Sequence, residues 1–186
     1  ILCLVGKQKQ QKRGKKMGNY EFFKKEFEFH GKHARMAGEL RVKGDCEHTY
    51  FRRLIDLYMV AAVVGFRVDR KAKEDFSPVG TKSILAEQII NAKEELDFIM
   101  QMMIMLDAKE HIPAEEAVKK AFRGAETEEE FLAYQSMFHD YVRGGVEELY
   151  ERLIIQKAEP DSEFYDNKTS NLMTVLERFG YCLQEN

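Results

Sequence analysis

The chain has 186 residues, 44% of them hydrophobic and 33% charged, with a formal net charge of −3. This length and composition are typical of a globular domain with one hydrophobic core. No run approaches the roughly 18 consecutive apolar residues of a membrane span. The three cysteines form neither a CxxC pair nor a disulfide framework. We therefore expect a cytoplasmic protein without a membrane partner.

Charge is distributed unevenly along the chain. Residues 1–86 carry 19 Lys and Arg against 10 Asp and Glu, whereas residues 87–186 carry 10 against 22. Such asymmetry favours an anionic partner for one end. Residues 1–18 are basic and lack apolar periodicity, which predicts a flexible tail or, equally, a translated purine-rich leader preceding a start at Met17. Residues 19–186 are predicted to form one helical domain.

The predicted elements begin with an alternating stretch at residues 26–29, typical of a short strand. A short helix follows over residues 31–42. The next helix, over residues 47–66, is apolar on nearly all sides and should be central in the domain. After a polar loop, a long helix is predicted from about residue 81 to residue 107, capped by Thr81 or Ser83.

This long helix carries two apolar faces. Phe98, Met102 and Met105 form one of them, so the helix should contact two neighbours. The other face is a heptad-like seam with alternating spacings of four and three. It consists of Leu85, Ile89, Ala92, Leu96, Ile99, Met103 and Leu106.

Three further helices are predicted near residues 113–124, 127–156 and 170–183. Thr127 begins a capping box for the second of these. Gly144 and Gly145 require either a break in that helix or another backbone passing close by. The sum is an all-α, single-domain helical bundle of five or six helices, with at most one short N-terminal strand.

Catalytic motifs are lacking in the sequence, and we expect neither an enzyme nor a cofactor. His30 and His33 are three residues apart and form a candidate metal site if a carboxylate joins them. Local polarity is the simpler interpretation of this pair. Asp56, inside an apolar helix, is expected to pair with Arg52 or Arg53.

Basic residues accompany the first two predicted helices and could form one patch for phosphate groups. Acidic neighbours are interleaved with them, so a solvated face of mixed charge is the competing interpretation. The candidate nucleic-acid ligands are Lys32, Arg35, Arg41, Lys43, Arg67, Arg70, Lys71 and Lys73.

Three segments, residues 29–34, 55–62 and 141–145, together resemble small helical proteins from bacterial restriction and phage-defence gene clusters. The resemblance spans roughly residues 20–155. It implies a subunit that works beside larger nucleic-acid enzymes, and it assigns no role to any single residue.

These observations favour a non-catalytic helical interaction subunit, an accessory component of a DNA-associated complex. One alternative is a metal-binding bundle or metal-dependent enzyme that uses His30 and His33. Another is a structural homo-oligomer that associates through the helix predicted over residues 81–107.

Overall fold

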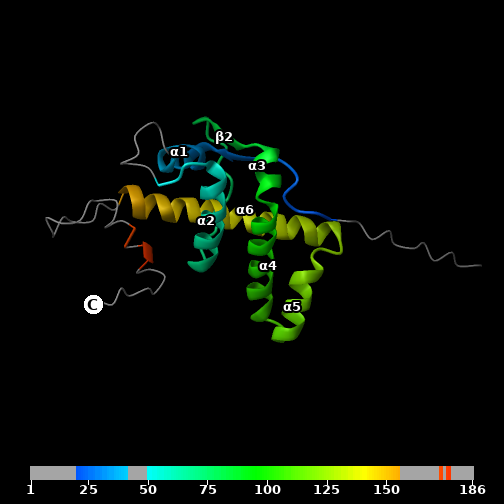
Figure 1. Ribbon diagram of the computed structural model, residues 1–186. Coiled ribbons are helices and arrows are strands. Elements are labelled where there is room, and N and C mark those ends of the chain that lie inside the picture. The colour runs from blue at the N-terminus through cyan, green and yellow to red at the C-terminus, as the bar shows by residue number, and fades with distance from the viewer. Residues whose placement is uncertain (1–19, 42–49, 156–171, 174, 177–186) are drawn as a thin grey trace, which may run out of the picture.

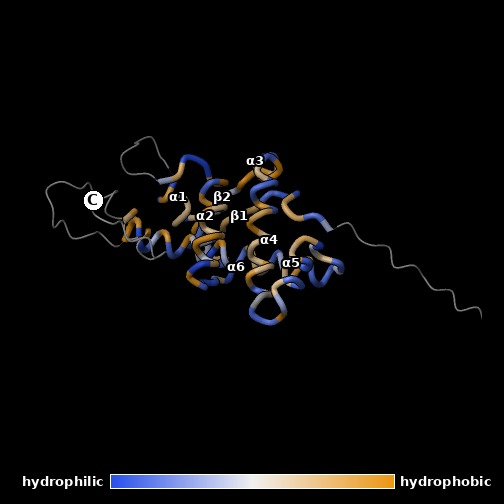
Figure 2. The backbone as a smooth tube through the Cα atoms, turned by 60° about the horizontal axis from the view of Figure 1, so that its bottom comes forward, coloured by the Kyte–Doolittle hydropathy of each residue, from blue (hydrophilic) through white to orange (hydrophobic). Residues whose placement is uncertain are grey.

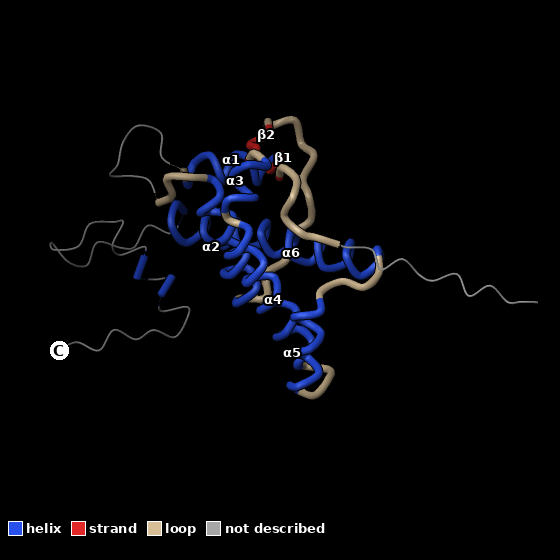
Figure 3. Tube along the Cα trace, turned by 45° about the vertical axis from the view of Figure 1, so that its right-hand side comes forward, coloured by secondary structure: helices blue, strands red, loops and turns tan. Residues whose placement is uncertain are grey.

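The computed structural model describes residues 20–41, 50–155, 172–173 and 175–176. Within them the chain is mainly helical, with six α-helices and one small sheet (Figures 1 and 3). None of these helices is long and apolar enough to cross a membrane. In chain order the elements are β1 (Phe27–His30), α1 (Gly31–Leu40), α2 (Leu54–Arg67), β2 (Thr81–Ile84), α3 (Ala86–Asn91), α4 (Lys93–Lys109), α5 (Ala114–Arg123), α6 (Glu128–Tyr150) and the π-helix η1 (Glu151–Ile155).

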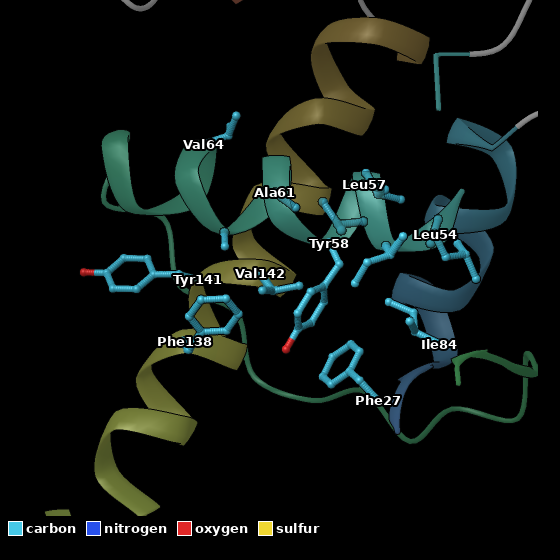
Figure 4. Packing of buried hydrophobic residues seen from close by; sticks show 14 of the residues in the cluster. Phe27, Leu54, Leu57, Tyr58, Ala61, Val64, Ile84, Phe138, Tyr141 and Val142 are labelled. Carbon is cyan, nitrogen blue, oxygen red and sulfur yellow. The ribbon is translucent and has the colours of Figure 1, made fainter. Parts of the chain in front are cut away.

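The core is built around the crossing of α2 and α6, which contact each other more extensively than any other two elements. In α2, the residues Leu57, Tyr58 and Ala61 are at most 1% exposed. They face Phe138 and Val142 of α6, which are fully buried (Figure 4). The prediction that α2 is central follows from its apolar composition and is consistent with this position.

Glycines allow α2 and α6 to cross at backbone contact. A Cβ atom on Gly145 would lie 1.8 Å from the carbonyl oxygen of Ala61, and one on Gly65 would lie 2.0 Å from that of Tyr141. A Cβ on Gly144 would lie 1.8 Å from the carbonyl oxygen of Arg70. Helix α6 continues unbroken through this pair, so the second of the two interpretations of the paired glycines is confirmed: another backbone passes close by.

The sheet is antiparallel and pairs β1 with β2, with Phe27 opposite Ile84 and His30 opposite Thr81. Phe27 and Phe29 point into the core while Glu28 is exposed, as their alternation predicts. The prediction of at most one short strand was wrong. A strand needs a partner for its backbone hydrogen bonds, and β2 is the partner of β1. Residues 81–83 are polar and exposed, so they carry no strand signal.

The single helix predicted from residue 81 to residue 107 is instead three elements. Residues 81–84 form β2, and the remainder is divided into α3 and α4 at Ala92, whose φ of −103° and ψ of 18° leave the helical region. Of the residues in the predicted seam, Ile89 of α3 is buried, as are Leu96 and Met103 of α4. Leu85, by contrast, is 57% exposed at the start of α3.

Helices α4 and α5 pack against each other as a hairpin, in which α4 contacts α2 and α5 projects from the rest of the described chain (Figure 3). Pro113 precedes α5, and Thr127 caps α6 by accepting a hydrogen bond from the backbone N–H of Glu130 at 3.1 Å. Residues 1–18, Lys43 and most of the helix predicted over residues 170–183 lie outside the described residues.

Candidate functional site

The outward side of α4 is apolar. Phe98 is 68% exposed and Leu106 is 38% exposed, and both share this side with the partly buried Met102 and Met105. We call these four residues the α4 outer face. Met102 and Met105 follow Phe98 at spacings of four and three residues, and Leu106 is four residues after Met102, which places all four on one side of the helix. The opposite side of α4, with Leu96, supplies the core. The sequence pattern placed Leu106 on that side, but its exposure puts it with the outer residues, and Met102 and Met105 also pack against the core.

A second pair of exposed apolar residues lies on α2. Val60 and Val63 of α2 are 41% and 38% exposed. Helices α2 and α4 contact each other and lie on the same side of α6 (Figure 1). Hydrophobic residues occur at intervals along α4 (Figure 2). Glu94 and Glu95 are exposed at its N-terminal end, so an acidic rim borders the apolar surface.

The predicted phosphate-binding residues lead to a different arrangement. Arg70, in the segment after α2, lies against three carboxylates at the C-terminal end of α6 and in η1. Its two terminal nitrogens bind both oxygens of Glu151 at 2.6 Å and also contact Glu147 and Glu148 at 3.1 Å. The hydrogen bond to Glu151 and the surrounding acids raise the pKa of Arg70.

Glu147 joins Arg70 to α1. Its Oε1 atom accepts hydrogen bonds from Lys32 Nζ at 2.7 Å and from His33 Nε2 at 3.0 Å. Burial raises the pKa of Glu147, but hydrogen bonds from Lys32 and His33 outweigh this effect and leave the pKa below its usual value. Burial lowers the pKa of His33. The pair is therefore a carboxylate and a neutral imidazole that donates through Nε2.

Three other predicted phosphate ligands, Lys73, Arg35 and Lys71, also have partners within the fold. Lys73 and Arg143 both pair with Asp140, which is only 5% exposed. Arg35 contacts Glu39 and the hydroxyl of Tyr150, each at 3.0 Å. The ammonium group of Lys71 lies 4.6 Å from the centre of the Tyr141 ring.

The uneven charge of the sequence is thus partly balanced inside the fold. Lys32, Arg70 and Lys73, from the basic half of the chain, pair with acidic residues of α6 and η1. Arg41 and Arg67 are exposed at the ends of α1 and α2. A nucleic-acid role for this set remains a prediction, and these contacts mean that most of its described members already have an intramolecular partner.

His30 and His33 face different neighbours. His30 Nε2 lies 3.4 Å from Glu74 and 3.7 Å from Glu28, whereas His33 points to Glu147. In the described ranges, no three His, Cys, Asp or Glu side chains are grouped so that they could hold a metal ion.

Asp56 pairs with Arg53, which is one of its two expected partners. The two hydrogen bonds between these side chains are 2.5 and 3.0 Å long.

Two features were missed by sequence reasoning. Glu147 is charged and was not singled out in the sequence, yet it is only 9% exposed and contacts three basic side chains, those of Lys32, His33 and Arg70. Its position three residues after Gly144 and three before the buried Tyr150 was the available signal. The sequence analysis used only the alternation at residues 26–29, and it did not predict that the phenylalanines of this region pack with rings of α2 and α6: Phe23 meets Phe138, and Phe27 meets Tyr58.

Comparisons with protein-family models, with curated proteins and with solved structures give no match to this chain.

Proposed function

We propose that this single-domain helical bundle is a non-catalytic interaction subunit that binds a protein partner through the α4 outer face. The observation that carries the proposal is Phe98, an aromatic side chain 68% exposed on the same helix side as Met102, Met105 and Leu106. Exposed aromatic residues are typical anchors of interfaces, and methionines adapt to a partner's shape. Single exposed apolar residues are ordinary, but a grouped set marks an interaction site.

The charges around this face indicate the kind of partner. Glu94 and Glu95 are exposed at one end of α4, and Asp107 is exposed at the other. A partner with an apolar strip bordered by Lys or Arg would complement this arrangement. The resemblance to small helical proteins of restriction and phage-defence clusters supports a partner within a DNA-associated complex.

Affinity capture with matched variants tests the proposal. The expected result is one partner that is retained by the wild type and lost by Phe98→Ser. Phe122→Ser is the control, because Phe122 is 72% exposed on α5 but lies outside the α4 outer face. With the partner purified, Phe98→Ser should weaken binding at least about tenfold, as loss of an aromatic anchor does.

Two outcomes would contradict the proposal. In the first, Phe98→Ser and Phe122→Ser lower the affinity for the purified partner equally. In the second, light scattering at micromolar concentration shows a homo-oligomer that Phe98→Ser dissociates, which would favour a structural homo-oligomer instead. A salt titration of duplex DNA binding tests the nucleic-acid part separately, since phosphate contacts weaken steeply as salt rises.

A further inference from the structure

Aromatic side chains from three parts of the chain surround a cavity of about 400 Å³. We call it the aromatic cavity, and its walls include Phe23, Phe27, Tyr58, Phe131, Phe138 and His139. The Phe23 ring meets Phe138 edge-on at 5.0 Å, and the Phe27 ring lies 4.8 Å from Tyr58 and 4.7 Å from His139. The cavity lies apart from the α4 outer face, none of whose four residues line it.

The backbone at Phe23 is strained in a way that shapes this cavity. Its φ of 58° places a bulky residue in the left-handed region, which such residues rarely adopt. The preceding residue is Phe22, whose ring stacks on that of Phe131 with centroids 4.9 Å apart and an angle of 17° between the planes. Local strain of this kind persists where the surrounding contacts impose it, and it is frequent at ligand sites.

Two polar groups in the walls lack hydrogen bonds to the described residues. Tyr58 is 1% exposed, and its hydroxyl is directed between the Phe27 and Phe138 rings (Figure 4). It makes no hydrogen bond within the described part of the chain, and the same holds for the imidazole of His139. His139 is partly exposed, and among the described residues the only side-chain atom that is fully buried without a hydrogen-bond partner is Nδ1 of His33. The Tyr58 hydroxyl and the His139 imidazole open onto the cavity, where a bound ligand can supply the partner that the described chain does not.

The two polar groups in the cavity wall are uncharged. Burial, together with the nearby positive charge of Arg143, lowers the pKa of His139 to about 4, so its imidazole is neutral at pH 7. Burial raises the pKa of Tyr58, so its hydroxyl keeps its proton. Two uncharged hydrogen-bonding groups in an aromatic wall suit a neutral ligand better than an ion, because they would not offset the cost of desolvating a charge.

We propose that the aromatic cavity binds a neutral, planar heteroaromatic ring of nucleobase size, with Tyr58 and His139 as its hydrogen-bonding groups. Flat rings offer faces for stacking against the phenylalanines and polar edge atoms for the two handles. The rim is mixed, with Lys24 and Lys25 beside Glu21, Glu26 and Glu128. A phosphate on the ligand should therefore add little to its binding.

Titration of the full chain with four nucleosides, adenosine, guanosine, cytidine and thymidine, tests this inference by calorimetry and NMR. At least one should bind saturably, with upfield shifts of its ring protons caused by stacked protein rings. Toluene, which has no polar edge, and trimethyl-lysine, which is a cation, should bind more weakly. No binding by any nucleoside up to millimolar concentration, or tighter binding of toluene or trimethyl-lysine, would overturn the inference.

A pair of tyrosine variants separates ligand binding from folding. Tyr58→Phe removes a hydroxyl that has no described partner, so it should leave the midpoint of thermal unfolding unchanged or higher while weakening nucleoside binding about three- to tenfold. Tyr141→Phe removes a hydroxyl that donates to Asp69 at 3.0 Å outside the cavity. It should lower the midpoint and leave the affinity unchanged. His139→Gln is a second cavity variant, and equal affinity in wild type, Tyr58→Phe and His139→Gln would also overturn the inference.

Discussion

Gly145 of α6 and Ala61 of α2 lie in direct backbone contact. A Cβ atom on Gly145 would be 1.8 Å from the carbonyl oxygen of Ala61 and 2.6 Å from its carbonyl carbon. Both neighbours are main-chain atoms, so no rotation of a side chain can relieve the overlap. The closeness of these two helices, and with it the core of the domain, depends on the absence of a side chain at this position.

Gly145→Ala should therefore separate α2 from α6 and lower the free energy of unfolding by at least about 3 kcal/mol, the upper end of ordinary overpacking costs. Urea unfolding followed by circular dichroism measures this change. Gly38→Ala is the matched control. Gly38 lies inside α1, and its added Cβ would meet only the end of the Lys82 side chain, at 3.5 Å. That variant should stabilise the protein by up to about 1 kcal/mol. Equal effects of the two variants would contradict the glycine contact.

Glu147 should be the most sensitive carboxylate of the ion-pair network on α6. Glu147→Gln keeps an oxygen for His33 but removes the charge that Lys32 and Arg70 share. We expect the free energy of unfolding to fall by about 1–3 kcal/mol, because the basic partners lose a half-buried counter-charge. Glu110→Gln, an exposed position just after α4, should change it by less than about 0.5 kcal/mol. A loss for Glu147→Gln as small as that of the control would show that the network adds nothing to stability.

The mainly helical fold could be predicted from the apolar patterns of its helices. In helix α2 the apolar run is nearly continuous, which predicts a central position, and α2 packs against α6. Strand β2 could not be predicted, because residues 81–83 are polar and exposed and are ordered by backbone pairing with β1. The break between α3 and α4 at Ala92 could not be predicted either, for a similar reason. Alanine is a good helix former, and its non-helical backbone reflects tertiary packing rather than propensity.

The basic residues of the candidate site could be identified from the sequence, but the carboxylates that pair with them could not. Arg70 and Glu151 are 81 residues apart, and nothing in the local sequence relates them. Their meeting follows from the glycine contacts that bring the end of α2 onto α6, where a Cβ on Gly144 would touch the carbonyl oxygen of Arg70. Long-range topology therefore decides whether a basic residue faces solvent or a carboxylate.

Phe29 tests the importance of the sheet that sequence reasoning underestimated. It is 1% exposed on β1 and meets Phe27 edge-on at 4.9 Å. Phe29→Ala should cost about 3–5 kcal/mol in the free energy of unfolding, as expected for truncation of a buried phenylalanine. Phe76→Ala, at a residue that is 76% exposed, should cost much less. Comparable losses in the two variants, measured by the same urea titration, would mean that β1 is not anchored in the core.

The partly buried imidazole of His139 should make the protein less stable in mild acid. Burial, with the charge of Arg143, holds its folded pKa at about 4, whereas the unfolded value is close to 6.5. Well above pH 6.5 neither state binds the proton, so stability is at its full value. Between pH 6.5 and pH 4 the unfolded chain takes up a proton that the folded chain does not. The free energy of unfolding should therefore fall by about 3 kcal/mol over this window.

His139→Leu removes the proton uptake and should flatten that part of the stability profile. His33, whose pKa is also lowered by burial, acts in the same direction and leaves a residual slope in the variant. Urea titrations at pH 7.0, 6.0, 5.0 and 4.5 on both proteins give the two profiles, and their difference isolates the contribution of His139. Parallel profiles would mean that His139 is protonated equally in the folded and unfolded chains, which contradicts its placement among Phe27, Tyr58 and Phe138.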